Sequence, residues 1–302
     1  MSKAHDTRHI LQALGVNALI AVLKGVAAAF TGSGAMLAET LHSASDCANQ
    51  GLLLFGVKRS QKPPDAQHPL GYGRALYFWS FMVALLLFTG GGVFSIYEGV
   101  HKFMHPEPLE GVGWAVLILV ISLALEGAST WGNVKELNAR RGPVPFFRFL
   151  RDTKDSDLIV VFGENAAATV GLVVALFALL MSVITGDTHW DGIGSAGVGV
   201  VLIGVAIFLA IEVKGLLVGE AADPAIEAAI RGVADGAPGV RSVLRVLTIQ
   251  QGPGEVMVAM KVELSSNLDT DGVYDTINNF EKMVRARLPE VRWLFVEPDR
   301  QE

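Results

Sequence analysis

The chain has 302 residues, of which 51% are hydrophobic and only 18% are charged, and its mean hydropathy is +0.43. This composition is too apolar for an ordinary soluble enzyme of this length and indicates a membrane protein. The net charge of −6 and the lack of a basic run argue against a nucleic-acid-binding protein, and the single cysteine, Cys47, excludes an intramolecular disulfide and a cysteine-based zinc finger.

Six apolar segments are each long enough, at about 20 residues, to cross a hydrocarbon core of about 30 Å. The first follows the polar sequence MSKAHDTRHI without a small-residue cleavage site, so we expect no removable signal peptide. The pattern predicts a domain of six membrane-spanning helices in residues 1–214. The expected spans are 10–30, 35–57, 76–97, 112–134, 158–184 and 193–213.

Lysine and arginine gather in three of the segments that flank these spans: before the first, between the second and third, and between the fourth and fifth. The other three loops contain one lysine, Lys102, and no arginine. Because basic loops stay on the cytoplasmic side, both termini are expected in the cytoplasm. We therefore expect a multi-pass protein of a bacterial inner membrane.

Residues 215–302 differ in character, because charges become frequent and helical and strand patterns alternate. The helical patterns cover 224–234 and 274–287, and the β-rich segments are 240–250, 255–264 and 291–296. The order αββαβ predicts a cytoplasmic α+β domain of the ferredoxin or metallochaperone type, with a helix layer on a three-stranded sheet. Such modules often dimerise through an exposed face, so we expect a homodimer.

The second span carries polar groups that need an explanation, because an ionisable side chain at the bilayer centre costs about 2.5–3.5 kcal/mol on insertion scales. His42, Asp46 and Asn49 follow one another at i, i+4 and i+7 and share one helix face. A histidine alone could simply hydrogen-bond to a neighbouring helix. An imidazole and a carboxylate together, with room for ligands from another helix, favour a tetrahedral site for a Zn²⁺-like ion.

Two further spans carry opposite charges at similar depth, Lys24 in the first and Glu126 in the fourth. We interpret them as a buried ion pair that holds these spans together, in preference to a role in transport. The fifth span adds Glu164 and Asn165.

Several features together resemble the cation diffusion facilitator family of divalent-metal/proton antiporters. Six spans, cytoplasmic termini and an αββαβ tail fit that family, as do GSGAMLAETLHSASDCANQ at 32–50 and HPLGYGRALYFWSF at 68–81. The resemblance covers nearly the whole chain. The sequence DPAIEAAI at 223–230, after GLLVGEAA, is similar to the branch that includes mitochondrial zinc carriers and their bacterial relatives.

The resemblance implies a transport site with two ligands on the second span and two on the fifth. The first two fall on His42 and Asp46. Aligning GLVVAL at 171–176 with the family pattern places Asn165 where an aspartate is expected and Val161 where a histidine or aspartate is expected. Glu164 stands beside them, so either Asn165 or Glu164 completes the metal site, with Asn49 as a further candidate.

The resemblance also points to metal sites outside the membrane, which this sequence carries incompletely. The loop after the second span has Asp65 and His68 as a partial set, with Tyr72 where relatives place another histidine. The tail has no histidine, and Glu297 and Asp299 stand where some relatives have a zinc site. Because zinc prefers nitrogen or sulfur ligands, we expect no high-affinity zinc site in the tail.

These observations predict secondary active efflux of a divalent transition metal in exchange for protons. Zn²⁺ is the favoured substrate, with Mn²⁺, Fe²⁺, Co²⁺ and Ni²⁺ as alternatives, and no cofactor is expected. The chain lacks an HExxH-type sequence, so we expect no enzymatic activity. The uncharged Asn165 leaves a second interpretation open: a non-transporting membrane scaffold or metal sensor with a degraded transport site.

Overall fold

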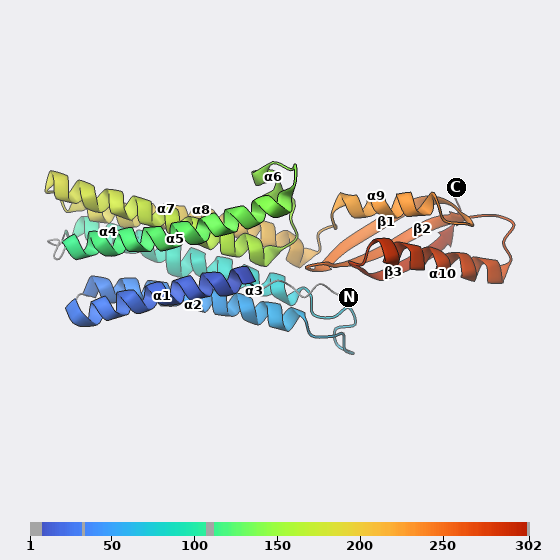
Figure 1. Ribbon diagram of the computed structural model, residues 1–302, viewed down its shortest axis with the longest axis horizontal. Coiled ribbons are helices and arrows are strands. Elements are labelled where there is room, and N and C mark those ends of the chain that lie inside the picture. The colour runs from blue at the N-terminus through green and yellow to red at the C-terminus, as the bar shows by residue number, and fades with distance from the viewer. Residues whose placement is uncertain (1–7, 32–33, 107–111, 301–302) are drawn as a thin grey trace.

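A computed structural model describes residues 8–31, 34–106 and 112–300. A few side chains at the end of α1 and the start of α2, that of His42 among them, are outside the described part. The helices of the first domain are α1 (Arg8–Thr31), α2 (Gly34–Ser60), α3 (Ala75–Leu86), the π-helix η1 (Leu87–Val93), α4 (Phe94–Met104), α5 (Val112–Arg141), α6 (Phe146–Asp152), α7 (Ser156–Thr185) and α8 (His189–Val218). Figure 1 shows the long helices side by side as a bundle, with the tail domain beyond one end.

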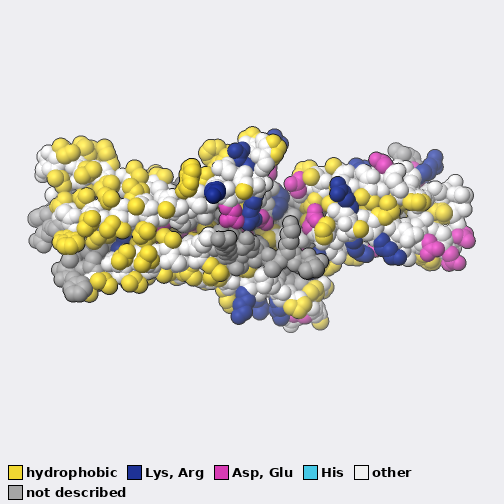
Figure 2. Space-filling model, viewed as in Figure 1, with side chains coloured by type: hydrophobic (Ala, Val, Ile, Leu, Met, Phe, Trp, Pro, Cys, Tyr) yellow, Lys and Arg dark blue, Asp and Glu magenta, His cyan; other side chains and the backbone are white. Residues whose placement is uncertain are grey.

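Four of the described helical segments are long and apolar enough to cross a membrane. They are 75–104, 112–141, 156–185 and 189–218, and α1 contains a shorter apolar stretch, Ile10–Val26. Helix α2 has a similar length but carries many polar residues, which lower its hydropathy. The chain is thus a multi-pass membrane protein, and many large apolar side chains of the bundle are exposed, as the face in Figure 2 shows.

The third expected span is a continuous helix made of α3, η1 and α4. Its central π-helical turn has the sequence LFTGGGV, and the three consecutive glycines, Gly90, Gly91 and Gly92, make a regular α-helix less favourable there. Helix α6 is a short element that the hydropathy pattern does not predict, because it lies in the polar segment between α5 and α7. Helix α8 continues past the expected end of the membrane domain, to Val218.

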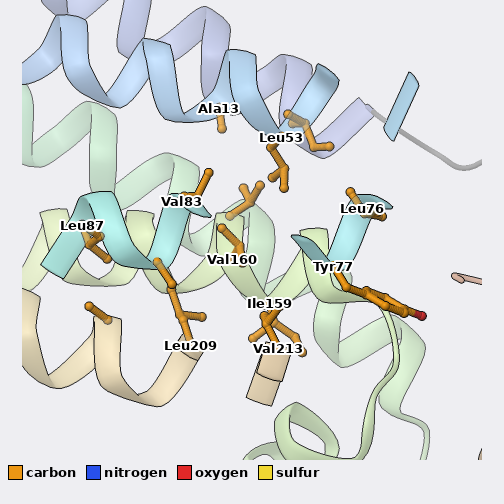
Figure 3. Packing of buried hydrophobic residues seen from close by; sticks show 14 of the residues in the cluster. Ala13, Leu53, Leu76, Tyr77, Val83, Leu87, Ile159, Val160, Leu209 and Val213 are labelled. Carbon is orange, nitrogen blue, oxygen red and sulfur yellow. The ribbon is translucent and has the colours of Figure 1, made fainter. Parts of the chain in front are cut away.

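The largest apolar core joins α1 and α2 to α3, α7 and α8 near the end of the bundle that faces the tail. Figure 3 shows Val160 among Leu53 of α2, Val83 of α3 and Leu209 of α8. All four side chains are completely buried. Burying a leucine or valine side chain contributes about 1.5–3 kcal/mol in water-soluble proteins, whereas close packing is the main term between helices in lipid.

Helix α8 meets the third span along a seam of glycines, backbone against backbone. A Cβ atom added at Gly99 would lie 2.7 Å from the carbonyl oxygen of Gly192 and would also clash with the amide nitrogen of Ala196. About two turns after Gly192 on α8, a Cβ at Gly199 would lie 2.8 Å from the carbonyl oxygen of Gly92. Small residues allow such approach, which maximises van der Waals contact between helices in lipid.

The tail domain has the elements α9 (Pro224–Ala234), β1 (Val240–Gly252), β2 (Glu255–Leu264), α10 (Thr270–Arg287) and β3 (Val291–Asp299). The sheet order is β1-β2-β3, with β1 and β2 antiparallel and β2 and β3 parallel. Alternate β2 residues, Val256, Val258, Met260 and Val262, are buried in one core with α9 and α10. The helices therefore cover one face of a small sheet.

The tip of the β1–β2 hairpin touches the start of the third span. A Cβ atom on Gly252 would lie 2.8 Å from Cα of Gly73, just before α3, so only two glycines fit at this contact. Beside it, Lys154 Nζ lies 2.8 Å from Glu220 Oε1, an ion pair between the α6–α7 connection and the segment after α8. In Figure 1 the hairpin reaches from the tail toward the bundle.

Candidate transport site

The polar face expected on α2 is present and extends further than its sequence pattern suggested. Ser43, Asn49 and Gln50 are buried, and Asp46 is partly buried. Asp46 and Gln50 are one helical turn apart, so they lie on the same side of α2. His42 lies on α2 one turn before Asp46, and its side chain is outside the described residues.

Glu164 on α7 faces this polar side of α2. Its side chain is 8% exposed, and its Oε2 accepts a hydrogen bond from Gln50 Nε2 at 2.7 Å. Its other oxygen, Oε1, is buried and accepts no hydrogen bond from the described residues. Asp46 and Glu126 are near enough to interact electrostatically with the carboxyl group, and the Asn49 amide donates toward it. The structure therefore brings Glu164 together with Asp46 and Asn49.

Asn165 faces a different neighbour. Its Nδ2 donates a hydrogen bond to Ser129 Oγ on α5 at 2.9 Å, and its backbone oxygen accepts one from Thr130 Oγ1 at 3.0 Å. Val161, at the other position that the alignment assigns to a ligand, is completely buried in the apolar core. Of the α7 candidates, Glu164 is thus the one directed at α2, and Asn165 joins α7 to α5.

A cavity of about 100 Å³ lies between α1, α2, α5, α7 and α8. Its walls include Lys24, Asp46 and Glu126, and Lys24 Nζ donates a hydrogen bond to Ser43 Oγ at 3.1 Å. Because one water molecule needs a cavity of roughly 10–15 Å³, the space can hold a cation with part of its hydration shell. Lys24 and Glu126, which we expect to form an ion pair, therefore line the same cavity as Asp46 of α2.

A family model described as the cation efflux transmembrane domain matches residues 10–218, which is more than half of the chain. The chain belongs to the cation diffusion facilitator family. It is 33% identical over 275 residues to "Proton-coupled zinc antiporter SLC30A9, mitochondrial" from Homo sapiens, covering 90% of this chain and 47% of that protein. This cation diffusion facilitator thus spans about half the length of that relative.

Two other relatives match this chain over different fractions of their own length. "Metal tolerance protein C4" from Arabidopsis thaliana is 33% identical over 223 residues, which are 72% of this chain and 48% of the relative. "Zinc transporter ZitB" from Escherichia coli (strain K12) is 28% identical over 284 residues, which are 91% of this chain and 83% of the relative. The similarity therefore extends beyond the membrane domain into the tail.

In this cation diffusion facilitator, the loop between α2 and α3 is held by its own hydrogen bonds. Asp65 Oδ2 accepts from Tyr72 Oη at 2.6 Å and from Lys62 Nζ at 3.1 Å, and Oδ1 accepts from the backbone amide of His68 at 2.9 Å. The Tyr72 hydroxyl, the His68 amide and the Lys62 ammonium together hold the pKa of Asp65 well below its usual range. Asp65 and His68 do lie together, but the Asp65 carboxylate already forms an ion pair with the Lys62 ammonium group.

In the tail, Glu297 and Asp299 both interact with Lys261. Lys261 Nζ lies 2.6 Å from Asp299 Oδ2 and 3.5 Å from Glu297 Oε1. The ammonium lowers the pKa of Asp299, and the two carboxylates raise the pKa of Lys261. Within the described residues, no group of three or more histidine, cysteine, aspartate or glutamate side chains could hold a metal ion.

Sequence reasoning did not identify Gln50, Ser129 or Lys62 as part of these arrangements. Gln50 could have been found from the sequence, since it lies four residues after Asp46 and therefore on the same face of α2. Ser129 had none, because its contact with Asn165 depends on how α5 and α7 are rotated against each other. Lys62 stands three residues before Asp65, a spacing that is ordinary in a charged loop.

Proposed function

We propose that this chain exports a divalent transition metal across a membrane by exchanging it for protons, with Zn²⁺ as the principal substrate. Membership of the cation diffusion facilitator family supports metal transport. Two relatives are named as zinc transporters, and one of these names states coupling to protons. The α2–α7 arrangement supplies the site at which metal and protons compete.

The observation that carries this function is the buried oxygen Oε1 of Glu164. An unsatisfied buried acceptor costs about 1–3 kcal/mol, and more when the group is charged. Such a group is retained within a membrane helix when it serves a substrate or proton pathway. Asp46 supplies a second carboxyl group near it, so a divalent cation finds more than one charged oxygen ligand at this place.

Coupling follows from the chemistry of the ligands. A carboxylate binds a metal only in its deprotonated form, so a proton and the metal exclude each other at Asp46 and Glu164. A bound metal displaces protons from these groups, and protons arriving from the other side displace the metal. Alternating exposure of the site to the two sides of the membrane converts this competition into exchange.

The donor set determines which metal binds best. The described carboxyl groups of Asp46 and Glu164 offer oxygen atoms, and oxygen ligands suit Mn²⁺ and Fe²⁺ as well as Zn²⁺. His42 adds an imidazole, which favours Zn²⁺, Co²⁺ and Ni²⁺. We propose Zn²⁺ with Asp46 and Glu164 as the charged ligands and His42 as the nitrogen ligand.

We further propose the membrane topology that the charge pattern predicts. All six spans cross a bacterial inner membrane, with both termini and the ferredoxin-like αββαβ tail in the cytoplasm. The distribution of lysine and arginine supports this orientation. The chain acts as a transporter and has no enzymatic role.

The tail supports a homodimer through the sheet face that α9 and α10 leave uncovered. On that face Leu247 and Phe295 are 51% and 58% exposed, and each lies opposite Ala259 in the register of the sheet. An exposed apolar patch of this kind is common at interfaces between protein chains. A second copy of the tail would cover both side chains.

Reconstitution into liposomes tests the transport function. Wild-type protein is expected to take up Zn²⁺ when a pH gradient is imposed, and Asp46→Asn and Glu164→Gln are each expected to lower the initial rate by on the order of tenfold or more. Rates with Mn²⁺, Co²⁺ and Fe²⁺ rank the substrates. The measurement is metal influx reported by a fluorescent indicator inside the liposomes.

Glu98→Gln is the matched control, because Glu98 lies on α4 and pairs with Lys102 away from the cavity. It removes a carboxylate without touching the proposed site, so its rate should equal that of wild type. Unchanged pH-driven flux in both site variants contradicts the assignment. A wild-type protein that binds metal but carries none across the bilayer would instead favour the scaffold or sensor interpretation.

A further inference from the structure

Gln50 is a buried polar residue that the expected transport site does not include. Its side chain is completely buried, and it follows Asp46 by one turn of α2. Its Nε2 donates to Glu164 Oε2 at 2.7 Å, which joins α2 to α7 at the site. Burial of an amide is unfavourable unless its polar atoms are satisfied, so its position here requires a reason.

The hydrogen bond satisfies only part of each group. Gln50 Oε1 and Glu164 Oε1 are both buried, and no residue that the structure describes donates a hydrogen bond to either. While Glu164 is ionised, the amide oxygen and the carboxylate oxygen are both acceptors and cannot satisfy each other. Two such oxygens on facing helices offer a pair of hard ligands to a cation.

We propose that Gln50 holds the Glu164 carboxylate toward α2 and presents its own Oε1 to the transported cation, so that it helps to set metal specificity. This role rests on the transport function proposed above. The sequence places an amide at Asn165, but that side chain donates to Ser129 on α5. The neutral oxygen of the site therefore comes from α2.

This arrangement has a consequence for metal choice. An amide oxygen is a hard ligand and suits Mn²⁺ and Fe²⁺, whereas Zn²⁺ binds more strongly to nitrogen and sulfur. Removing the oxygen of Gln50 should therefore weaken binding of Mn²⁺ more than binding of Zn²⁺. A residue that only joined two helices would change both affinities equally or not at all.

Isothermal titration of the full chain in detergent, with Zn²⁺ alone and with Mn²⁺ alone, tests this role. Gln50→Met keeps the size of the side chain but removes both polar atoms. It is expected to raise the Kd for Mn²⁺ by about tenfold or more, the effect typical of groups that orient a metal ligand, and the Kd for Zn²⁺ by less. An unchanged ratio of the two Kd values overturns the proposal.

Gln50→Glu is the second variant, because it keeps an oxygen at this position and adds a charge. It should bind both metals and tighten Mn²⁺ relative to Zn²⁺, and an unchanged ratio would again overturn the proposal even if Gln50→Met does not fold. Asn133→Leu is the matched control, since it removes a buried amide from α5. Its ratio of Kd values should equal that of wild type.

The two proposals can fail separately. If wild-type protein neither binds nor transports a divalent metal, the proposed function fails and the role of Gln50 fails with it. If wild-type protein transports metal and the Gln50 variants keep the wild-type ratio of affinities, only the role of Gln50 fails. Initial rates in liposomes for the same variants, split into KM and maximal rate, separate weakened binding from slower turnover.

Discussion

The bundle packs its helices in two different ways. Along the seam between the third span and α8, glycines such as Gly99 and Gly192 bring backbones into direct contact. Among α1, α2, α5 and α7, buried polar side chains form hydrogen bonds, Lys24 with Ser43 and Gln50 with Glu164, and Lys24 and Glu126 line one cavity. The seam depends on the absence of side chains, so added volume there should act on folding. The polar group depends on particular atoms, so changes there should act on binding and transport.

The largest effect is expected at the seam. Gly99→Val places side-chain atoms where the Gly192 carbonyl and the Ala196 amide already lie, so the helices must separate along their length. We expect a loss of at least about 3 kcal/mol of stability, which is the upper range for overpacking. Thermal melting followed by size-exclusion chromatography of the detergent-solubilised protein measures it.

Gly127→Val on α5 is the matched control, because an added Cβ at Gly127 meets no described atom within 4 Å. It should melt close to wild type. If Gly99→Val and Gly127→Val melted at the same temperature, the backbone contact at the seam would not be what holds the two helices together, and the contrast between the two regions would fail.

A smaller effect is expected in the polar group. Lys24 and Glu126 line one cavity, and the sequence predicts that they form an ion pair. Lys24→Met and Glu126→Gln should each lower stability by leaving the other charge uncompensated, and the double variant should recover part of the loss. We expect a coupling energy of about 1–3 kcal/mol from a double-mutant cycle of detergent unfolding. Additive losses would show that the two charges do not interact.

The smallest effect is expected in the loop between α2 and α3, outside both regions. The folded state lowers the pKa of Asp65, so this carboxylate stabilises the loop above its ordinary pKa, and the contribution is lost as the pH falls through the lowered value. Tyr72→Phe removes the strongest of its hydrogen bonds. The variant should therefore lose loop order at a higher pH than wild type, which amide hydrogen exchange of residues 62–72 can follow between neutral and acidic pH. Identical acid transitions would contradict this.

The positions of the long helices could be predicted from the sequence because a backbone in lipid must satisfy its own hydrogen bonds, which leaves helices as the consistent solution for long apolar segments. The polar face of α2 could also be predicted, since Asp46 and Asn49 stand at helical spacing. Helix α6 and the π-helical turn at Gly90–Gly92 could not, because neither has a distinctive apolar period.

The partner of the α2 site on α7 could not be decided from sequence. Successive residues on an α-helix point about 100° apart, so Glu164 and Asn165 face different neighbours, and the choice depends on the rotation of α7 within the bundle. That rotation is set by contacts such as the hydrogen bond from Asn165 to Ser129 and the burial of Val161. These contacts join residues far apart in the sequence and leave no local pattern.

The touching point of Gly73 and Gly252 also limits how this protein can be recombined. A tail domain taken from a relative would pack against this bundle only if it had a glycine at the position of Gly252. The bundle would likewise need a glycine at position 73, before α3. A chimera of two relatives therefore needs a glycine at both positions, one from each half, even though the two are far apart along the chain.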